Sequence, residues 1–575
     1  MPPWVARQCH VLRGLKPASV RVCRRPHVSL RPYTQAPTGD DGNLKIRSAN
    51  SAIIIPRSVV GTTPEDLIQH ITPIGKGRLK YNRCAVFLVT PSFAPWLLDD
   101  SAFIQKAIHH TYSECLGPAD PRYARVYALC AVVDKLPAPK PIHPAEDLGN
   151  EAASRSNQPP IGESGFEGMA YATLRYADWI ASSFEPPDDQ ALISFVASTT
   201  SESVGYFADT LRLPLANTIF QTGSPSTMID SLWVKNKGGQ EFALKRKRSA
   251  KHHSIKIHAF APGTRQASSL AVPLIPLTVP RRVEASMGNI LRRVTGPDGE
   301  SALASQELEQ VVPQFYNARR ESSQATMVWA LVISKEKLKP ILAATDSALG
   351  RLPDDIATGS MMTDAELWDS LWKKRPAAWN DLVPNALVAG ARLHRVLSGG
   401  GGWGKKAGLL SLDPVASAPD TNSSASDMSD GPDNLSSALQ QVARDGDYIQ
   451  FFISPSNNID DSVDPLQQLQ EAAGLGSKWS WELGTIPSTV DALPAGSWQH
   501  NSSTTKETFV FRNCFGALTE GGVSINRNFE LRRKEASPPI GGSKIDVPFS
   551  RFSSASLGPE GDIHDEDVGG LGESV

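Results

Sequence analysis

Short runs of apolar residues alternate with amphipathic stretches through the first half of the chain. Three runs are almost continuously apolar, over residues 51–56, 84–90 and 125–134. Such runs are typical of strands that are covered on both faces. Thr63 and Pro64 precede two acidic residues, which predicts the start of a helix. A longer helix is predicted over residues 101–115. The alternation therefore predicts an α/β fold.

The same reading extends to the rest of the chain. Helices are predicted over residues 170–182, 284–293, 306–320, 364–374, 437–444 and 465–473. Strands are predicted over residues 192–197, 215–220, 327–334, 448–454 and 507–512. We expect a two-lobed, mixed-sheet body with one α/β domain over 45–235 and a second over 236–411. A small C-terminal α+β region is expected over 437–550.

Three polar segments interrupt this pattern. Residues 137–165 are rich in Pro, Ser, Asn and Gly, which predicts an inserted loop or linker. Residues 412–436 are dominated by Ser, Asp, Asn and Pro, so they bury too little apolar area to offset their ordering entropy. We expect a disordered linker there, and disordered termini that include an acidic tail over 551–575.

The first 34 residues hold seven basic side chains, and no acid occurs before Asp40. This Arg-rich, acid-poor composition with interleaved apolar residues is that of a mitochondrial transit peptide. The segment ends Arg31-Pro32-Tyr33-Thr34, which resembles the Arg-x-Tyr site cut by matrix processing peptidases. Cleavage there would leave Thr34 first. The alternative is a basic tail that binds nucleic acid or nothing.

Composition narrows the classes of function. The chain of 575 residues is too long for one core, so two or three domains are expected. Without the presequence, 51 Lys and Arg stand against 60 Asp and Glu, a net charge near −9. A nucleic-acid site would therefore be a local patch. No apolar run approaches the roughly 18 residues of a membrane span. The Cys and His residues lack zinc-ligand spacing, so no metal is predicted.

A glycine-rich string over residues 397–406 is the first candidate site. It fits GxxxxGK, in which backbone N–H groups converge on an anion and a Lys reaches the outer phosphates. The candidate residues are Gly399, Gly402, Trp403, Gly404 and Lys405, with His394 just upstream. Lys406 occupies the position of the usual Mg²⁺ ligand, and only a short helix is expected to follow. The alternatives are a flexible loop, and a core histidine at His394.

A basic string is the second candidate site. It contains Lys245, Arg246, Lys247, Arg248 and Lys251, and more arginines follow over 281–293. Clustered cations neutralise phosphates on RNA or on anionic lipid. The alternative is a solvated surface segment. Few aromatic residues accompany the string, so recognition of single strands by stacking is not indicated.

Catalytic patterns are scarce. The chain has no G-x-S-x-G, no H-E-x-x-H, and no G-x-G-x-x-G after a predicted strand. Asp134 ends a buried strand, where ligands of open α/β sheets often bind, or it serves as a turn residue. Whether the protein is an enzyme stays open, and no cofactor is indicated.

The presequence, residues 84–92 and residues 397–414 together resemble a family of fungal mitochondrial proteins. The N-terminal half, through residues 223–225, is similar to FIST-type sensor domains, which are proposed to bind small ligands. That similarity covers about a third of the chain and supplies no catalytic residue. We expect a soluble matrix protein with a binding or accessory role, with a small anionic ligand as the first choice. The alternatives are an RNA- or ribosome-associated factor and an enzyme for a phosphate-bearing substrate.

Overall fold

A computed structural model gives the arrangement of the chain. It describes residues 50–75, 79, 82–115, 125–138, 162–180, 191–201, 205–236, 241–257, 265–296, 299–322, 327–350, 363–374, 382–399, 408–414, 442–454, 469, 480–488, 507–530 and 540–557. All of these belong to one compact unit, Arg47–Val575. The predicted transit peptide, most of the predicted linker over 412–436 and most of the acidic tail lie outside the described residues. The prediction of disorder is wrong for the start of the tail, because residues 551–557 form a strand that pairs on both sides.

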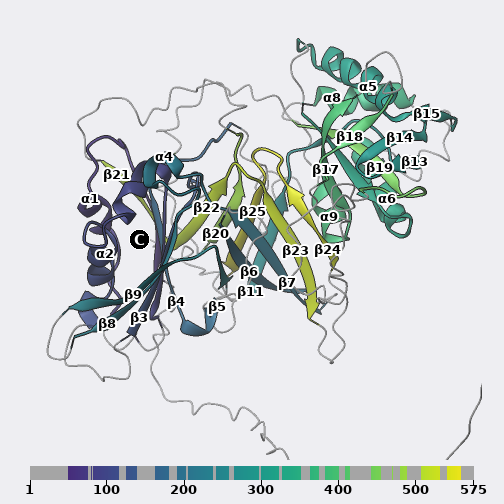
Figure 1. Ribbon diagram of the computed structural model, residues 1–575. Helices are drawn as coiled ribbons and strands as arrows, with labels where there is room; N and C mark the ends of the chain where they lie inside the picture. The colour runs from purple at the N-terminus through teal and green to yellow at the C-terminus, as the bar shows by residue number, and fades with distance from the viewer. Residues whose placement is uncertain are drawn as a thin grey trace, which may run out of the picture. The chain divides into compact units, whose positions relative to one another are not determined.

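The first sheet has seven strands (Figure 1). Their order is β21 (Thr508–Arg512), β1 (Ser51–Pro56), β4 (Met169–Leu174), β2 (Cys84–Val89), β3 (Arg125–Val132), β8 (Met228–Lys235) and β9 (Phe242–Ser249). Strands β2 and β3 are parallel, and their other neighbours are antiparallel. Every residue of β1, β2 and β4 is buried. The prediction of strands covered on both faces is confirmed for β1 and β2.

Helices cover one face of this sheet. Figure 1 shows α1 (Pro64–Ile68) and α2 (Ile104–Thr111) along it, and both contribute side chains to a core with β1, β2 and β3. The backbone N–H of Thr63 donates to the Asp66 carboxylate over 2.9 Å, so the predicted cap begins α1. The 3-10 helix η1 (Pro91–Leu97) lies against the same core.

Two further sheets pack on the opposite face. The second sheet has the order β24 (Ile540–Ile545), β23 (Val523–Glu530), β7 (Gly205–Pro214), β6 (Leu192–Ser201), β10 (His252–Ile257) and β5 (Trp179–Ile180). The third has the order β11 (Arg265–Ala271), β25 (Arg551–Leu557), β20 (Ser480–Thr485) and β22 (Cys514–Thr519). Side chains from all three sheets share one apolar core. Phe195, Trp481 and Phe515 meet in it with ring centroids 4.4–6.3 Å apart.

A separate set of strands closes into a ring. Each strand pairs with the next in the order β19 (Tyr448–Ile453), β13 (Arg281–Met287), β14 (Ile290–Thr295), β18 (Leu410–Leu412), β17 (Arg392–Gly399) and β16 (Val328–Ile333), and β16 pairs back with β19. Helices α5 (Ala304–Arg319) and α8 (Asp364–Lys373) pack on its core. The helix α6 (Leu338–Leu349) and the short α9 (Leu382–Val388) belong to the same part of the chain. These elements lie between Arg281 and Ile453, so they come from both the predicted second domain over 236–411 and the predicted C-terminal region over 437–550.

Three element predictions are wrong. Residues 170–182 were expected to be helical, but the described residues 170–180 form β4, a short 3-10 helix and β5. Residues 284–293 form most of the hairpin β13–β14 around Gly288, whose φ is 60°. Residues 215–220 contain the start of helix α4 (Ile219–Thr222) rather than a strand. In the first two cases, pairing with strands distant in sequence decides the conformation of short segments.

The predicted domain boundaries also differ from the observed pairing. Residues 437–550 do not form a region of their own, because their described strands join every sheet: β21 the first, β23 and β24 the second, β20 and β22 the third, and β19 the ring. Likewise β9, β10 and β11, expected in the second lobe, belong to the first three sheets. The mixed α/β class with mixed sheets is confirmed.

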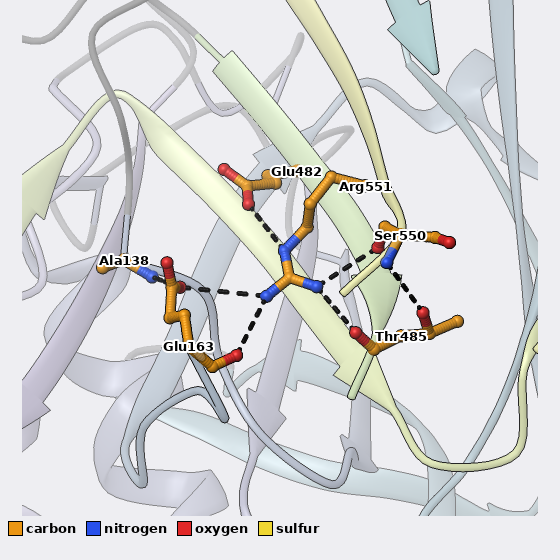
Figure 2. Close-up of polar contacts among 6 residues, drawn as sticks. All are labelled: Ala138, Glu163, Glu482, Thr485, Ser550 and Arg551. Atoms are coloured by element: carbon orange, nitrogen blue, oxygen red, sulfur yellow. Dashed lines mark hydrogen bonds and ion pairs between the residues drawn. The ribbon is translucent and has the colours of Figure 1, made fainter. Parts of the chain in front are cut away.

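A buried arginine ties the third sheet to the base of the polar insertion (Figure 2). Arg551 is 4% exposed, and its Nε donates to Glu482 over 3.1 Å. Its Nη1 donates to the carbonyl of Thr485 over 2.7 Å, and its Nη2 to that of Glu163 over 3.4 Å. The Glu163 carboxylate accepts the N–H of Ala138 over 3.2 Å. Both ends of the segment 139–161 are therefore fixed, while the segment itself lies outside the described residues.

None of the described helices combines the length and apolar character that a membrane crossing requires. The cysteines outside the presequence, Cys84, Cys115, Cys130 and Cys514, are free thiols and buried. Burial raises the pKa of each. Cys84 on β2 and Cys130 on β3 thus pack as small apolar residues of strands.

Candidate functional site

Polar side chains gather where the first and second sheets end. Strand β9 is the last strand of the first sheet, and β5 is the last of the second. We name this group the edge cluster, and its members are Arg83, Tyr127, Tyr176, Trp179, Asp230, Arg246, Arg248 and His253. The rings of Tyr127 on β3 and Trp179 on β5 lie 6.5 Å apart, so the cluster bridges the two sheets. Deeper between the sheets the residues are apolar.

Strand register brings the charged members together. Arg248 on β9 lies directly opposite Asp230 on β8, which in turn pairs with Leu129 on β3. Arg246 pairs with Leu232, and Leu232 pairs with Tyr127. Because directly opposed residues share a face of the sheet, these side chains project on the side that packs against the second sheet.

Asp230 is the buried acid of the edge cluster, with 2% exposure. Its Oδ2 atom accepts from Nε of Arg248 over 2.6 Å, and Nη2 of Arg246 lies 3.6 Å away. Its Oδ1 atom has no hydrogen-bond partner among the described residues. One of its two oxygens therefore retains the capacity to accept.

His253 is the buried base of the edge cluster, also with 2% exposure. Its ring packs on Trp179 with centroids 4.2 Å apart, and its Nε2 has no partner in the described part of the chain. Burial lowers the pKa of His253 to about 4, although the charge of Asp230 acts in the opposite direction. The imidazole is therefore neutral at pH 7 and offers one donor and one acceptor.

A row of aromatic rings connects this buried end to the surface. The ring of Tyr127 lies 5.0 Å from that of Tyr176, and Cζ of Arg83 lies 5.3 Å from the Tyr176 centroid. Tyr176 is 48% exposed. Nε of Arg83 is buried without a partner among the residues described. An ion pair between Arg175 and Asp178, 2.8 Å long, holds the 3-10 helix η4 (Tyr176–Asp178).

The basic string predicted as a site forms the edge strand β9. Lys247 pairs with Asp100 over 2.5 Å, while Arg246 and Arg248 face Asp230. Lys245 sits at an irregularity in the pairing of β8 with β9, and Lys251 follows the strand. The arginines over 281–293 lie on β13 and β14 of the strand ring. The two groups of cations thus belong to different sheets.

The glycine-rich string joins two antiparallel strands. Gly399 is the last residue of β17 and pairs with Leu410 of β18. Gly402, Trp403, Gly404 and Lys405 lie outside the described residues. Because a strand follows the loop and α9 precedes β17, the order is not the strand, loop and helix of a phosphate cradle. No helix is described between β17 and β18, and binding through backbone N–H groups stays a prediction.

His394 lies in the core of the second lobe, with 2% exposure. Its Nδ1 is 2.8 Å from the carbonyl oxygen of Asp413, so Nδ1 must carry the proton. Its Nε2 has no partner among the described residues, and burial lowers the pKa of His394 to about 4. A neutral imidazole with its donor already used does not attract an anion, which weakens its place in the predicted anion site.

Asp134 follows β3 and fixes a turn. Its Oδ2 accepts the N–H of Glu520 over 2.9 Å. Burial and the charge of Glu520 raise the pKa of Asp134 to about 6, against hydrogen bonds from Glu520 and Thr519 that lower it. These contacts favour the reading of Asp134 as a turn residue.

The described residues offer one Ser–His pair as a possible catalytic group and no cluster of metal ligands. Ser194 Oγ lies 2.7 Å from Nε2 of His252, but Ser194 is 2% exposed and sits mid-strand. The Ser194 hydroxyl is therefore shielded from solvent within β6. The described residues contain no cluster of three or more His, Cys, Asp or Glu arranged to hold a metal ion.

Comparisons with protein-family models, curated proteins and solved structures found no match. The sequence pattern does not predict the edge cluster: it marks Arg246 and Arg248 only as parts of a basic string. One local signal was present. Asp230 is the lone acid inside the otherwise uncharged run over residues 227–234, and a buried acid requires a partner or a role.

Proposed function

We propose that this protein is a small-ligand-binding, accessory protein that takes its ligand at the edge cluster. The observation that carries the proposal is the pair of buried polar atoms, Asp230 Oδ1 and His253 Nε2, which lack partners among the described residues. They lie on two facing sheets beside aromatic rings. Binding sites commonly combine a mostly apolar, aromatic wall with a few convergent polar groups.

The energetic argument concerns polar atoms removed from water. A buried donor or acceptor without a partner costs about 1–3 kcal/mol, and more when the group is charged. Buried polar groups of folded proteins are therefore nearly always paired. A ligand whose N–H or O–H groups donate to Asp230 Oδ1 and to a lone pair of His253 would recover this cost. The ligand would enter from the side of the edge cluster where the exposed Tyr176 lies.

Two features of the sequence support the wider proposal. The presequence composition supports a mitochondrial matrix location. The similarity of the N-terminal half to FIST-type sensor domains, which are proposed to bind small ligands, favours binding over catalysis. No described constellation favours a reaction.

The test measures ligand binding by the full chain. Native mass spectrometry would identify a co-purified small molecule, and titration of that molecule would be followed by Trp fluorescence, because Trp179 packs on His253. His253→Phe should weaken binding at least tenfold, since a hydrogen bond is lost. His394→Phe is the matched control, with equal burial and a similarly unpartnered Nε2. Equal affinity in both variants would exclude the edge cluster.

The alternative function is association with RNA or the ribosome. It is favoured by the row of exposed cations on β9, but ion pairs to Asp100 and Asp230 neutralise part of that row. A salt-dependent affinity for RNA that falls in Lys245→Gln would support it. If Lys245→Gln binds RNA with the same affinity as the unaltered chain, the RNA site does not lie on β9.

A further inference from the structure

The charge of the edge cluster bears on what it binds. Three arginines, Arg83, Arg246 and Arg248, accompany one carboxylate, Asp230, and the neighbouring Arg175 and Asp178 cancel each other. The neutral His253 adds no charge, so the cluster carries an excess of two positive charges. Positive potential beside buried aromatic surface selects anionic partners.

The two arginines of β9 have donors to spare. Arg248 uses Nε on Asp230, and Arg246 approaches the same oxygen only through Nη2 at 3.6 Å. Their side chains are 52% and 50% exposed, at the rim of the cluster. A guanidinium presents five N–H donors in a planar fork that matches a carboxylate or a phosphate. Asp230 thus forms an ion pair with both arginines but takes only one of their N–H donors in a hydrogen bond.

The arginines at the rim offer hydrogen-bond donors, whereas the buried end of the cluster offers mainly acceptors. Asp230 Oδ1 can only accept, and His253 adds one acceptor and one donor. We infer that the ligand is a small organic anion whose carboxylate or phosphate binds Arg246 and Arg248 at the rim, and whose N–H or O–H groups donate to Asp230 and His253 inside. This inference rests on the proposed function, since it assigns a ligand class to the same site.

The binding test uses calorimetry of the full chain. The probes are inorganic phosphate, a sugar phosphate, a nucleoside monophosphate with its nucleoside, and an aromatic hydroxy acid with its amide. Arg246→Gln should lower the affinity for the anion about tenfold or more, since one charge-assisted contact is lost. The affinity should also depend less on salt. The uncharged analogue of that anion should bind Arg246→Gln and the unaltered chain equally.

Two further variants separate folding from recognition. Arg248→Lys keeps a positive charge beside Asp230, so the fold is retained. It removes the planar fork and should therefore also lower the affinity for the anion. Lys247→Gln is the matched control, because Lys247 lies on the same strand and pairs with Asp100 instead. It should leave affinity unchanged.

The outcomes distinguish the inference from the proposed function. If His253→Phe weakens a ligand but Arg246→Gln and Arg248→Lys do not, the site stands and the anionic class is wrong. If none of the three changes the affinity of a bound probe, the site itself is wrong. If no probe binds, or if the ligand co-purified with the chain is uncharged or cationic, the inference is overturned.

Discussion

Asp134→Asn should stabilise the protein at neutral pH. Asp134 caps the turn after β22 through the N–H of Glu520, and an amide oxygen at the same position accepts the same bond. The substitution removes the charge and one of the two carboxylate oxygens, and it keeps an oxygen for the N–H of Glu520. Burial raises the pKa of the carboxyl group from its usual value near 3.8 to about 6, so the folded state opposes ionisation more than the unfolded chain does.

The magnitude follows from this difference in pKa. One pKa unit corresponds to about 1.4 kcal/mol, so ionised Asp134 costs the folded protein about 2–3 kcal/mol. The sign follows from proton binding. Below about pH 3.8 both states are protonated and the cost is absent. As the pH rises toward about 6 the unfolded state ionises first, and stability falls by about 1.4 kcal/mol per pH unit. Above about pH 6 the full cost remains.

Urea unfolding of the full chain and of Asp134→Asn, between about pH 4 and pH 8, tests this. The two proteins should be nearly equal at the acid end, and the variant should be more stable by about 2–3 kcal/mol above about pH 6.5. Asp209→Asn is the contrasting control. Asp209 is fully buried and accepts both Nε and Nη2 of Arg527, at 2.6 and 2.7 Å, so its loss should destabilise. A constant difference between the Asp134 proteins, or a less stable variant at pH 8, would refute the argument.

Three other predictions rest on local geometry or charge. Arg551→Leu should cost about 3–5 kcal/mol, because it removes the buried cation that pairs with the carboxylates of Glu163 and Glu482. Arg57→Leu at an exposed ion pair should cost less than about 1 kcal/mol by urea unfolding; equal costs would contradict the burial argument. Gly408→Val should lower the melting temperature more than Gly61→Val. Both glycines have φ near 80°, but only at Gly408 would a Cβ lie 2.6 Å from Leu303. Replacing the arginines of residues 21–31 by Glu should abolish mitochondrial import of a fluorescent fusion, and unimpaired import would refute the targeting prediction.

The sequence predicted best where the local pattern was strong. Strands β1, β2 and β16 are runs of apolar residues, and each is buried throughout. A continuously apolar strand has to be buried on both faces in any fold, so its prediction depends little on the rest of the structure. Helices α5 and α8 were also predicted, over residues 306–320 and 364–374, close to their observed bounds.

The sequence failed where a partner decides the conformation. Strand β13 pairs with β19, and β1 pairs with β21 more than 450 residues later. Short segments have weak intrinsic preferences, so long-range pairing outweighs them. The same pairing places the C-terminal strands in every sheet, which no local pattern indicates.

The residues of the edge cluster were determined by the sequence, but their association was not. Residue type alone marks Asp230 as the lone acid of the otherwise uncharged run over residues 227–234 and Arg248 as part of a basic strand. Strand register then sets Arg248 opposite Asp230, and packing of the second sheet on the first brings His253 and Trp179 to them. This packing removes Asp230 and His253 from water. A polar atom without a partner costs free energy only when it is buried, so these residues become a candidate site only in the folded protein.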